Sequence, residues 1–321
     1  MKAAAVVTSM IFIFLGLIAL NAPAGAAQNE LIAKKAAKAP VIDGKPDKSW
    51  NKVRPVKIQL TEGKHPKEVT AAVKALYTDT DLYLLIRWKD ATESYNRVYE
   101  FDGTQWVKRK GNEDRMGIMW DINDNIKDFK VKGCAALCHE DGKYMKTNGP
   151  AERGDVWHWK AQRTNPVGYA DDQMLTDVLK KGGEETGRVA DAKEGGSYSK
   201  NWDKAAKRPK YRFKDKSRSG ARLIKAEAVS ISQDDTFAKG MILPKEVLAK
   251  PVGSRGDIEA RGIWKKGTWT LEIKRALKTG HDDDVQFDPA KIYSFGVSIF
   301  DNTHEKEHAT TTDTSYKLIF K

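Results

Sequence analysis

The chain has 321 residues and a formal net charge of +12, with 40% hydrophobic and 31% charged residues. This balance excludes collagen-like, coiled-coil and wholly disordered proteins, and the length suffices for one large domain or two small ones. Residues 1–26 have a basic start at Lys2, an uncharged apolar run and small residues at the end, which is the pattern of a secretory signal peptide. We therefore expect an exported protein, in the periplasm or an equivalent compartment, whose signal peptide is cleaved. An uncleaved membrane anchor is the alternative.

Segments with alternating, β-branched or aromatic residues predict strands in both outer parts of the chain. These segments are residues 56–60, 69–77, 81–88, 116–122, 292–300 and 312–320. Residues 263–273 predict a hairpin that turns at Lys265 to Gly267. The sequence therefore predicts a mainly β fold.

The middle of the chain differs from both ends. Residues 170–181 predict one short helix, because two aspartates stand at its start and two glycines follow it. The remainder of residues 131–220 is rich in turn formers, and a loop of this length is usually either a site or disorder. We expect a single antiparallel β-sandwich over residues 38–321 with this loop-rich insertion.

Residues 200–225 carry eleven basic residues against two acidic ones. An exported protein rarely meets nucleic acid, so an acidic protein partner or anionic lipid headgroups at a membrane surface fit this charge better. A solvated loop without a partner is the plain alternative.

Cys134, Cys138 and His139 match the way in which haem c is attached, with two thiols bonding the vinyl groups and a histidine binding the iron. The usual spacing places two residues between the cysteines, and here there are three. A disulfide between Cys134 and Cys138 is the alternative in an oxidising compartment. A structural zinc site is disfavoured because the chain has no second cysteine pair.

Met145 stands six residues after His139, and a methionine thioether suits haem iron. Trp157 and Trp159 could form a pocket wall that keeps water from an apolar cofactor. Each of these three residues could equally be ordinary core packing. His158, between the two tryptophans, could support a ligand by a hydrogen bond or be a satisfied loop histidine.

Residues 304–308 spell the zinc-protease string His-Glu-x-x-His, but that chemistry needs a helix, and the neighbouring residues favour strands. In an extended chain, residues two apart share a face, so Lys306 and His308 could face one pocket. Phosphate-binding loops, dinucleotide fingerprints and serine-nucleophile motifs are absent from the sequence. We therefore predict no catalytic residues and no small-molecule substrate.

Taken in order, these motifs resemble the haem-binding subunits related to the γ subunit of ethylbenzene dehydrogenase, which also accompany dimethylsulfide dehydrogenase, chlorate reductase and nitrite oxidoreductase. The resemblance spans nearly the whole mature chain and is carried by residues 40–50, 75–88, 114–120, 145, 157–160 and 284–302. It implies a DOMON-like or CBM9-like β-sandwich that holds one haem b between a methionine and a lysine near the C-terminus. Met145 matches the methionine, and the second iron ligand would be His308, which stands closest to the last strand, or Lys306.

The cysteine motif goes beyond the basic family pattern and looks like the haem c motif of some anammox-type cytochromes. The resemblance thus implies haem c on Cys134 and Cys138 with His139 as iron ligand, and also haem b at Met145. One covalent haem that uses both regions is the simpler possibility.

The expected function is electron transfer by an exported cytochrome that has no turnover of its own. Its partners would be the iron–sulfur and molybdenum subunits of an oxidoreductase, or another acidic redox protein. One alternative is a carbohydrate-binding module, because the opening element at 42–50 also resembles sugar-binding sandwiches. Trp157, Trp159, Trp264 and Trp269 would then be stacking platforms. Another alternative is a disulfide-bonded structural subunit without haem.

Overall fold

The computed structural model describes residues 29–321 except 65, 138–144, 180–185, 305–306 and 313. The predicted signal peptide at 1–26 lies outside the described residues, and so do Cys138, His139 and Lys306. Within the described part, no helix is long and apolar enough to cross a membrane. The chain is mainly β and forms a sandwich, which confirms the predicted fold class.

The largest sheet joins thirteen strands of the described chain. They are β1 (Glu30–Lys35), β2 (Val56–Leu60), β3 (Val69–Tyr77), β4 (Asp81–Lys89), β7 (Arg115–Asp121), β8 (Gly154–Lys160), β9 (Asp171–Leu175), β10 (Arg188–Ala190), β17 (Glu259–Trp264), β18 (Thr268–Ala276), β19 (Ile292–Phe300), β20 (Ala309–Thr310) and β21 (Tyr316–Phe320). Smaller sheets contain β5 (Val98–Phe101), β6 (Trp106–Lys108), β11 (Gly195–Lys200), β12 (Tyr211–Phe213), β13 (Leu223–Ile224), β14 (Ala228–Ser230), β15 (Ile242–Pro244) and β16 (Glu246–Val252).

Helical structure in the described residues is limited to short pieces. The α-helix is α1 (Phe129–Lys132). Single 3-10 turns occur at η1 (Lys48–Lys52), η2 (Ile122–Asp124), η3 (Gly133–Ala136), η4 (Asn165–Val167), η5 (Lys225–Glu227) and η6 (Ser254–Gly256).

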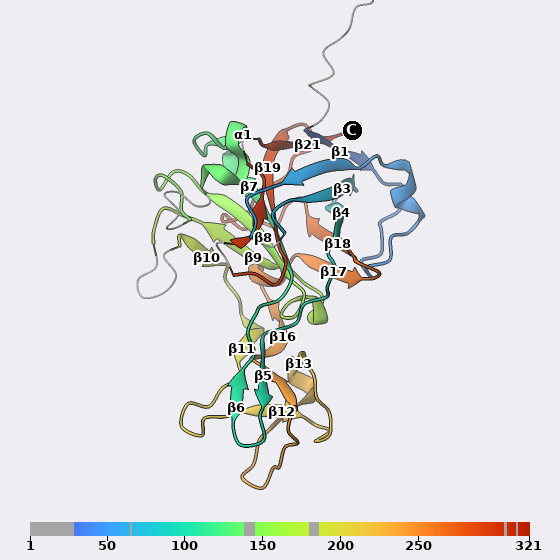
Figure 1. Cartoon of the computed structure of the whole chain (residues 1–321). Coiled ribbons are helices and arrows are strands. Elements are labelled where there is room, and N and C mark those ends of the chain that lie inside the picture. Colours follow the sequence, from blue (N-terminus) through green and yellow to red (C-terminus); the bar gives the residue numbers. More distant parts are fainter. Residues whose placement is uncertain (1–28, 65, 138–144, 180–185, 305–306, 313) are drawn as a thin grey trace, which may run out of the picture.

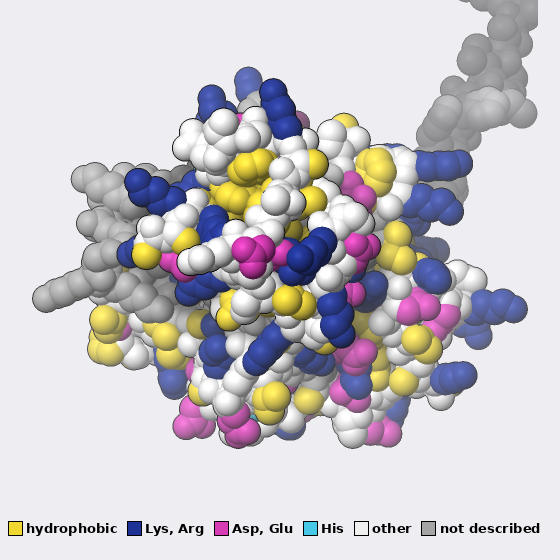
Figure 2. Space-filling model, turned by 90° about the horizontal axis from the view of Figure 1, so that it is seen from below, with side chains coloured by type: hydrophobic (Ala, Val, Ile, Leu, Met, Phe, Trp, Pro, Cys, Tyr) yellow, Lys and Arg dark blue, Asp and Glu magenta, His cyan; other side chains and the backbone are white. Residues whose placement is uncertain are grey.

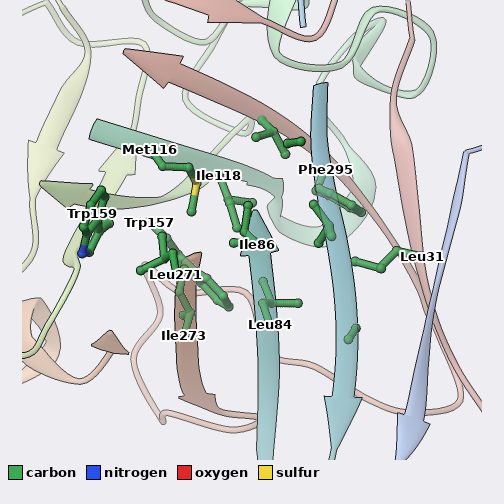
Figure 3. Packing of buried hydrophobic residues seen from close by; sticks show 14 of the residues in the cluster. Leu31, Leu84, Ile86, Met116, Ile118, Trp157, Trp159, Leu271, Ile273 and Phe295 are labelled. Carbon is green, nitrogen blue, oxygen red and sulfur yellow. The ribbon is translucent and has the colours of Figure 1, made fainter. Parts of the chain in front are cut away.

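The large sheet folds into two facing layers with the main core between them (Figures 1 and 3). The first layer has the order β17-β18-β4-β3, and the second has the order β10-β9-β8-β7-β19-β21. Strand β1 joins them because it pairs in parallel with both β21 and β3. Trp159 of the second layer packs on Trp88 and Trp269 of the first, with ring centroids 6.0 and 5.0 Å away. Each large apolar side chain buried here contributes roughly 1.5–3 kcal/mol relative to exposure.

The predicted hairpin is confirmed as β17 and β18, which pair from Glu259–Lys274 to Trp264–Trp269. The Lys265 amide donates to the Thr268 carbonyl at 2.9 Å. Lys266 and Gly267 have φ values of +48° and +73°. Positive φ at both central residues is the turn geometry that matches the twist of two paired strands.

The predicted helix at 170–181 is wrong in its described part, because residues 171–175 form strand β9. The two aspartates at its start do not cap a helix. Asp171 contacts Lys160 and Arg255, and Asp172 lies 3.6 Å from Arg275. These buried charge contacts come from distant parts of the chain, and they override the local helix signal.

Residues 131–220, which the sequence predicted to be loop-rich, contribute strands β8 to β12. All seven residues of β8 are buried, so the strand lacks the apolar–polar alternation by which half-exposed strands are recognised. The sandwich also begins with β1, which lies before the predicted start at residue 38.

A smaller lobe extends from one end of the sandwich (Figure 1). It contains the short sheets and has its own apolar core, which includes Tyr99, Trp106, Phe213, Leu243 and Val247. Ion pairs link the lobe and its neck to the sandwich, among them Arg97–Glu113 and Arg255–Asp171.

The opening element at 42–50 packs on the outer face of the first layer. Glu272 of β18 accepts hydrogen bonds from Trp50 Nε1 at 3.0 Å and from the Gly44 amide at 2.9 Å. Gly44 has a φ of +80°, which favours glycine. Trp50 is buried with Val53, Leu76, Tyr83 and Leu85. The element therefore fastens the chain to the sandwich.

Candidate functional site

The outer face of the second layer brings together most of the described candidate ligands. Gly117, His158 and Ser298 stand side by side on β7, β8 and β19, because Gly117 pairs with both of the others. We call this row and the residues that cover it the His158 face. Two members of the row are small, so the covering segments can approach the strands closely.

Cys134 and Met145 lie in one apolar cluster that covers part of this face. Cys134 is buried, and Met145 is partly buried against the same group of residues. The other buried members of the cluster are Met119, Ile126, Phe129, Leu137, Val156 and Leu175. A Cβ on Gly296 of β19 would lie 2.7 Å from the Cys134 Cβ, so glycine allows Cys134 to lie directly on the sheet. The structure thus brings Cys134 and Met145 together.

His308 belongs to the same layer, on the far side of Phe300. The Phe300 ring lies 4.4 Å from the His308 ring and 5.6 Å from the His158 ring, measured between centroids. The Arg115 guanidinium covers the Phe300 ring at 4.1 Å. A single aromatic side chain therefore separates two buried histidines.

The His158 imidazole is buried, and only one of its two ring nitrogens is close to a hydrogen-bond partner in the described part of the chain. Its Nδ1 lies 3.3 Å from Gln173 Oε1, and its Nε2 has no hydrogen-bond partner among the described residues. An amide oxygen accepts, so Nδ1 carries the proton and Nε2 has the lone pair. Burial lowers the pKa of His158 well below its usual value, and the cations Lys160 and Arg188 act in the same direction. A neutral imidazole with a buried lone pair is suited to binding a metal.

Trp157 and Trp159 lie on the opposite face of β8. Trp157 packs on Trp120 and Phe287, and Trp159 lies between Trp88 and Trp269, all within the main core. Figure 3 shows both indoles among the side chains between the layers. Because successive residues of a strand point to opposite faces, Trp157 and Trp159 lie on the other side of the sheet from Met145.

Burial argues against the carbohydrate-binding alternative, because most of the tryptophans that would stack on a sugar lie inside the core. Trp157, Trp159 and Trp269 are at most 1% exposed. Trp264 is partly buried and donates from Nε1 to the Asp90 carbonyl. Stacking on a sugar needs an exposed ring face, and three of these four tryptophans have no exposed ring face.

His158 is the residue whose role the sequence left undecided. The local signal was its place between two tryptophans, since a polar residue between apolar neighbours in a strand points to the other face. That signal could have been used only if β8 had been recognised as a strand.

The family model described as ethylbenzene dehydrogenase matches residues 47–311. The chain therefore belongs to the ethylbenzene dehydrogenase family, which associates it with an oxidoreductase. No curated protein matches the chain at the sequence level.

Among solved structures, the chain is similar to a family 9 carbohydrate-binding module from Caldicellulosiruptor kristjanssonii in complex with glucose. The identity is 11%, the TM-score is 0.39, and 91% of this chain and 95% of that one are covered. A putative carbohydrate-binding protein from Bacteroides uniformis matches with 7% identity, a TM-score of 0.40, and coverage of 91% and 99%. At these TM-scores the likeness carries no information about a ligand.

Proposed function

We propose that the chain is an exported haem-binding subunit that relays electrons to or from a molybdenum oxidoreductase. The observation that carries the proposal is the set of donors gathered at the second layer. Met145, His158 and His308 supply one thioether and two imidazoles to this layer, and all three are buried or partly buried. Family membership supports the same function.

The residues present fit a haem group. Thioether and imidazole are the usual neutral ligands of haem iron in electron-transfer proteins. The Nε2 atom of His158 is buried without a partner among the described residues, and the cluster around Met145 is apolar. Such surroundings would keep water away from the iron and thereby tune its reduction potential. A bound haem would supply a one-electron iron couple.

We propose Met145 and His308 as the axial pair of haem b, with Lys306 as the alternative to His308. Haem c would be bonded to Cys134 and Cys138, with His139 on its iron. His158 is added as a further candidate ligand, because its imidazole lies between the Met145 cluster and Phe300. If one covalent haem uses both the cysteine motif and the Met145 region, its ligands would come from this same set of residues.

The partner would meet a surface on which charge is mixed. Figure 2 shows the molecule from the side of the smaller lobe, where Lys and Arg side chains alternate with Asp and Glu. Some basic residues of 200–225 have acidic partners: Arg212 and Lys216 contact Asp235 at 2.8 and 3.0 Å, and Arg218 contacts Glu227 at 3.1 Å. The remaining excess of positive charge would speed docking of an acidic redox protein, and this effect would weaken with salt.

Replacement of Met145 with alanine is expected to lower the reduction potential, because loss of a thioether ligand removes its stabilisation of the reduced iron. His158→Ala and His308→Ala test the two imidazoles in the same way. The measurement is a redox titration followed by visible absorption spectroscopy. His281→Ala is the matched control, because His281 is exposed and outside the His158 face. An unchanged spectrum and potential in Met145→Ala would remove Met145 from the ligand set.

A further inference from the structure

A second group of polar residues lies at one end of the main core, away from the His158 face. Asp155 and Asp172 come from the core-facing sides of β8 and β9, and Asp283 and Asp284 come from the loop after β18. Asp155, Asp172 and Asp284 place one oxygen each within 4.8 Å of one another. Asp191, Asp283 and Asp284 do the same. Asp284 is therefore shared by two overlapping carboxylate triads.

The first triad has its own cation. Arg275 of β18 is 1% exposed, and its Nη2 lies 2.8 Å from Asp284 Oδ2 and 3.5 Å from Asp155 Oδ2. Its Nε lies 3.6 Å from Asp172 Oδ2. The Val285 amide also donates to Asp155 at 3.0 Å. One guanidinium thus faces three buried carboxylates.

The second triad contains an aspartate that has no hydrogen-bond partner in the described part of the chain. Asp191 is 6% exposed, and neither of its carboxylate oxygens has a hydrogen bond within the described residues. Burial, together with the charges of Asp283, Asp155, Asp284 and Asp257, raises the pKa of Asp191 to about 8. A buried carboxylate that faces mainly other carboxylates is costly unless a cation joins it.

We propose that Asp191, Asp283 and Asp284 bind a calcium ion. The three donors are carboxylate oxygens, which a hard cation prefers, and the triad offers no nitrogen or sulfur for zinc. Calcium–oxygen distances of about 2.3–2.6 Å allow ligands on one ion to lie as far apart as these oxygens do. The ion would offset the charge that Arg275 leaves unbalanced.

Two members of the triad lie near solvent. Of the three aspartates, Asp284 lines a pocket of about 810 Å³. Asp283 is partly exposed, so the triad lies between the core and the surface. An ion could enter here and keep water molecules as additional ligands.

A third carboxylate group differs from the Asp191 triad in its hydrogen bonds. Asp90, Asp114 and Asp301 also lie close together. Asp114, however, accepts hydrogen bonds from the Ser94 amide at 2.7 Å, the Asn302 amide at 3.1 Å and Trp269 Nε1 at 3.2 Å. Asp191 has no such donors among the described residues.

Isothermal titration of the metal-stripped full chain with CaCl₂ tests the proposal. We expect one calcium to bind, and Asp191→Asn to weaken the affinity by more than about tenfold. Asp234→Asn is the matched control, because it removes the same charge from an exposed residue of the smaller lobe that lines neither the triad nor its pocket, and it should leave the affinity unchanged. Calcium should also raise the thermal unfolding temperature of the wild type and not that of Asp191→Asn.

The absence of a calcium-binding heat in the wild type would overturn the proposal and would indicate that protons neutralise the triad. Equal calcium affinity in Asp191→Asn and the wild type would overturn it too. Equal binding of MgCl₂ would overturn the assignment to calcium. Should Asp191→Asn fail to fold, Asp283→Asn serves as the second ligand variant, because Asp283 is partly exposed. None of these outcomes depends on haem, so the proposed function can stand or fall separately.

Discussion

Replacing Arg275 with methionine is expected to lower the free energy of unfolding by about 3–5 kcal/mol, the usual cost of removing one partner from a buried ion pair. The guanidinium is buried between Asp155, Asp172 and Asp284. It also lies over the Trp157 ring at 5.2 Å, so its loss affects both charge balance and packing. The measurement is urea-induced unfolding at constant pH.

Arg261→Met is the control for this prediction. Arg261 lies on the neighbouring strand β17, is exposed, and donates to the Asn165 carbonyl at 2.9 Å. Its replacement should cost much less than that of Arg275. Equal losses from the two variants would contradict the view that Arg275 balances buried carboxylates.

Replacing Trp159 with alanine is expected to cost about 3–5 kcal/mol of unfolding free energy, as for other large aromatic side chains in a core. Trp159 is fully buried, and its Nε1 donates to Asn165 Oδ1 at 3.2 Å. A Cβ on Gly262 would lie 2.5 Å from its ring, which shows how closely the first layer packs on it. Urea unfolding measures the loss.

The Trp159→Ala variant also distinguishes a packing role for Trp159 in the core from a role as a wall of the haem site. Because its ring lies on the core side of β8, the absorption spectrum of a bound haem should not change in folded Trp159→Ala protein. Trp264→Ala is the control for stability, since Trp264 is only partly buried and should cost less. A shifted haem spectrum with little loss of stability would instead make Trp159 a wall of the cofactor site.

The parts of the fold that could be predicted from sequence are those with local signals. Strands β3 and β19 were predicted at 69–77 and 292–300, where the structure has them, because their residues are β-branched and aromatic. Strand β8 was missed because burial on both faces removes its alternation. The local pattern of β9 favours a helix because its aspartates resemble caps, whereas in the folded chain Lys160, Arg255 and Arg275 contact them.

The candidate site was only partly predictable for a related reason. Met145 and Cys134 are close in sequence, and the structure brings them into one cluster. The position of His158 depends on the register of β8 with β7, which no local pattern fixes. The Asp191 triad joins residues about 90 positions apart, so only the folded chain places them together.

The measurement that tests the central claim most directly is a pyridine haemochrome spectrum of the protein. The chain should be produced in a host that matures haem c, and the spectrum recorded before and after acid–acetone extraction. The account predicts a haem spectrum in which part of the haem stays with the polypeptide through Cys134 and Cys138. A haem b at Met145 would appear in the extract. Purified, folded protein that contains no haem at all would contradict the account.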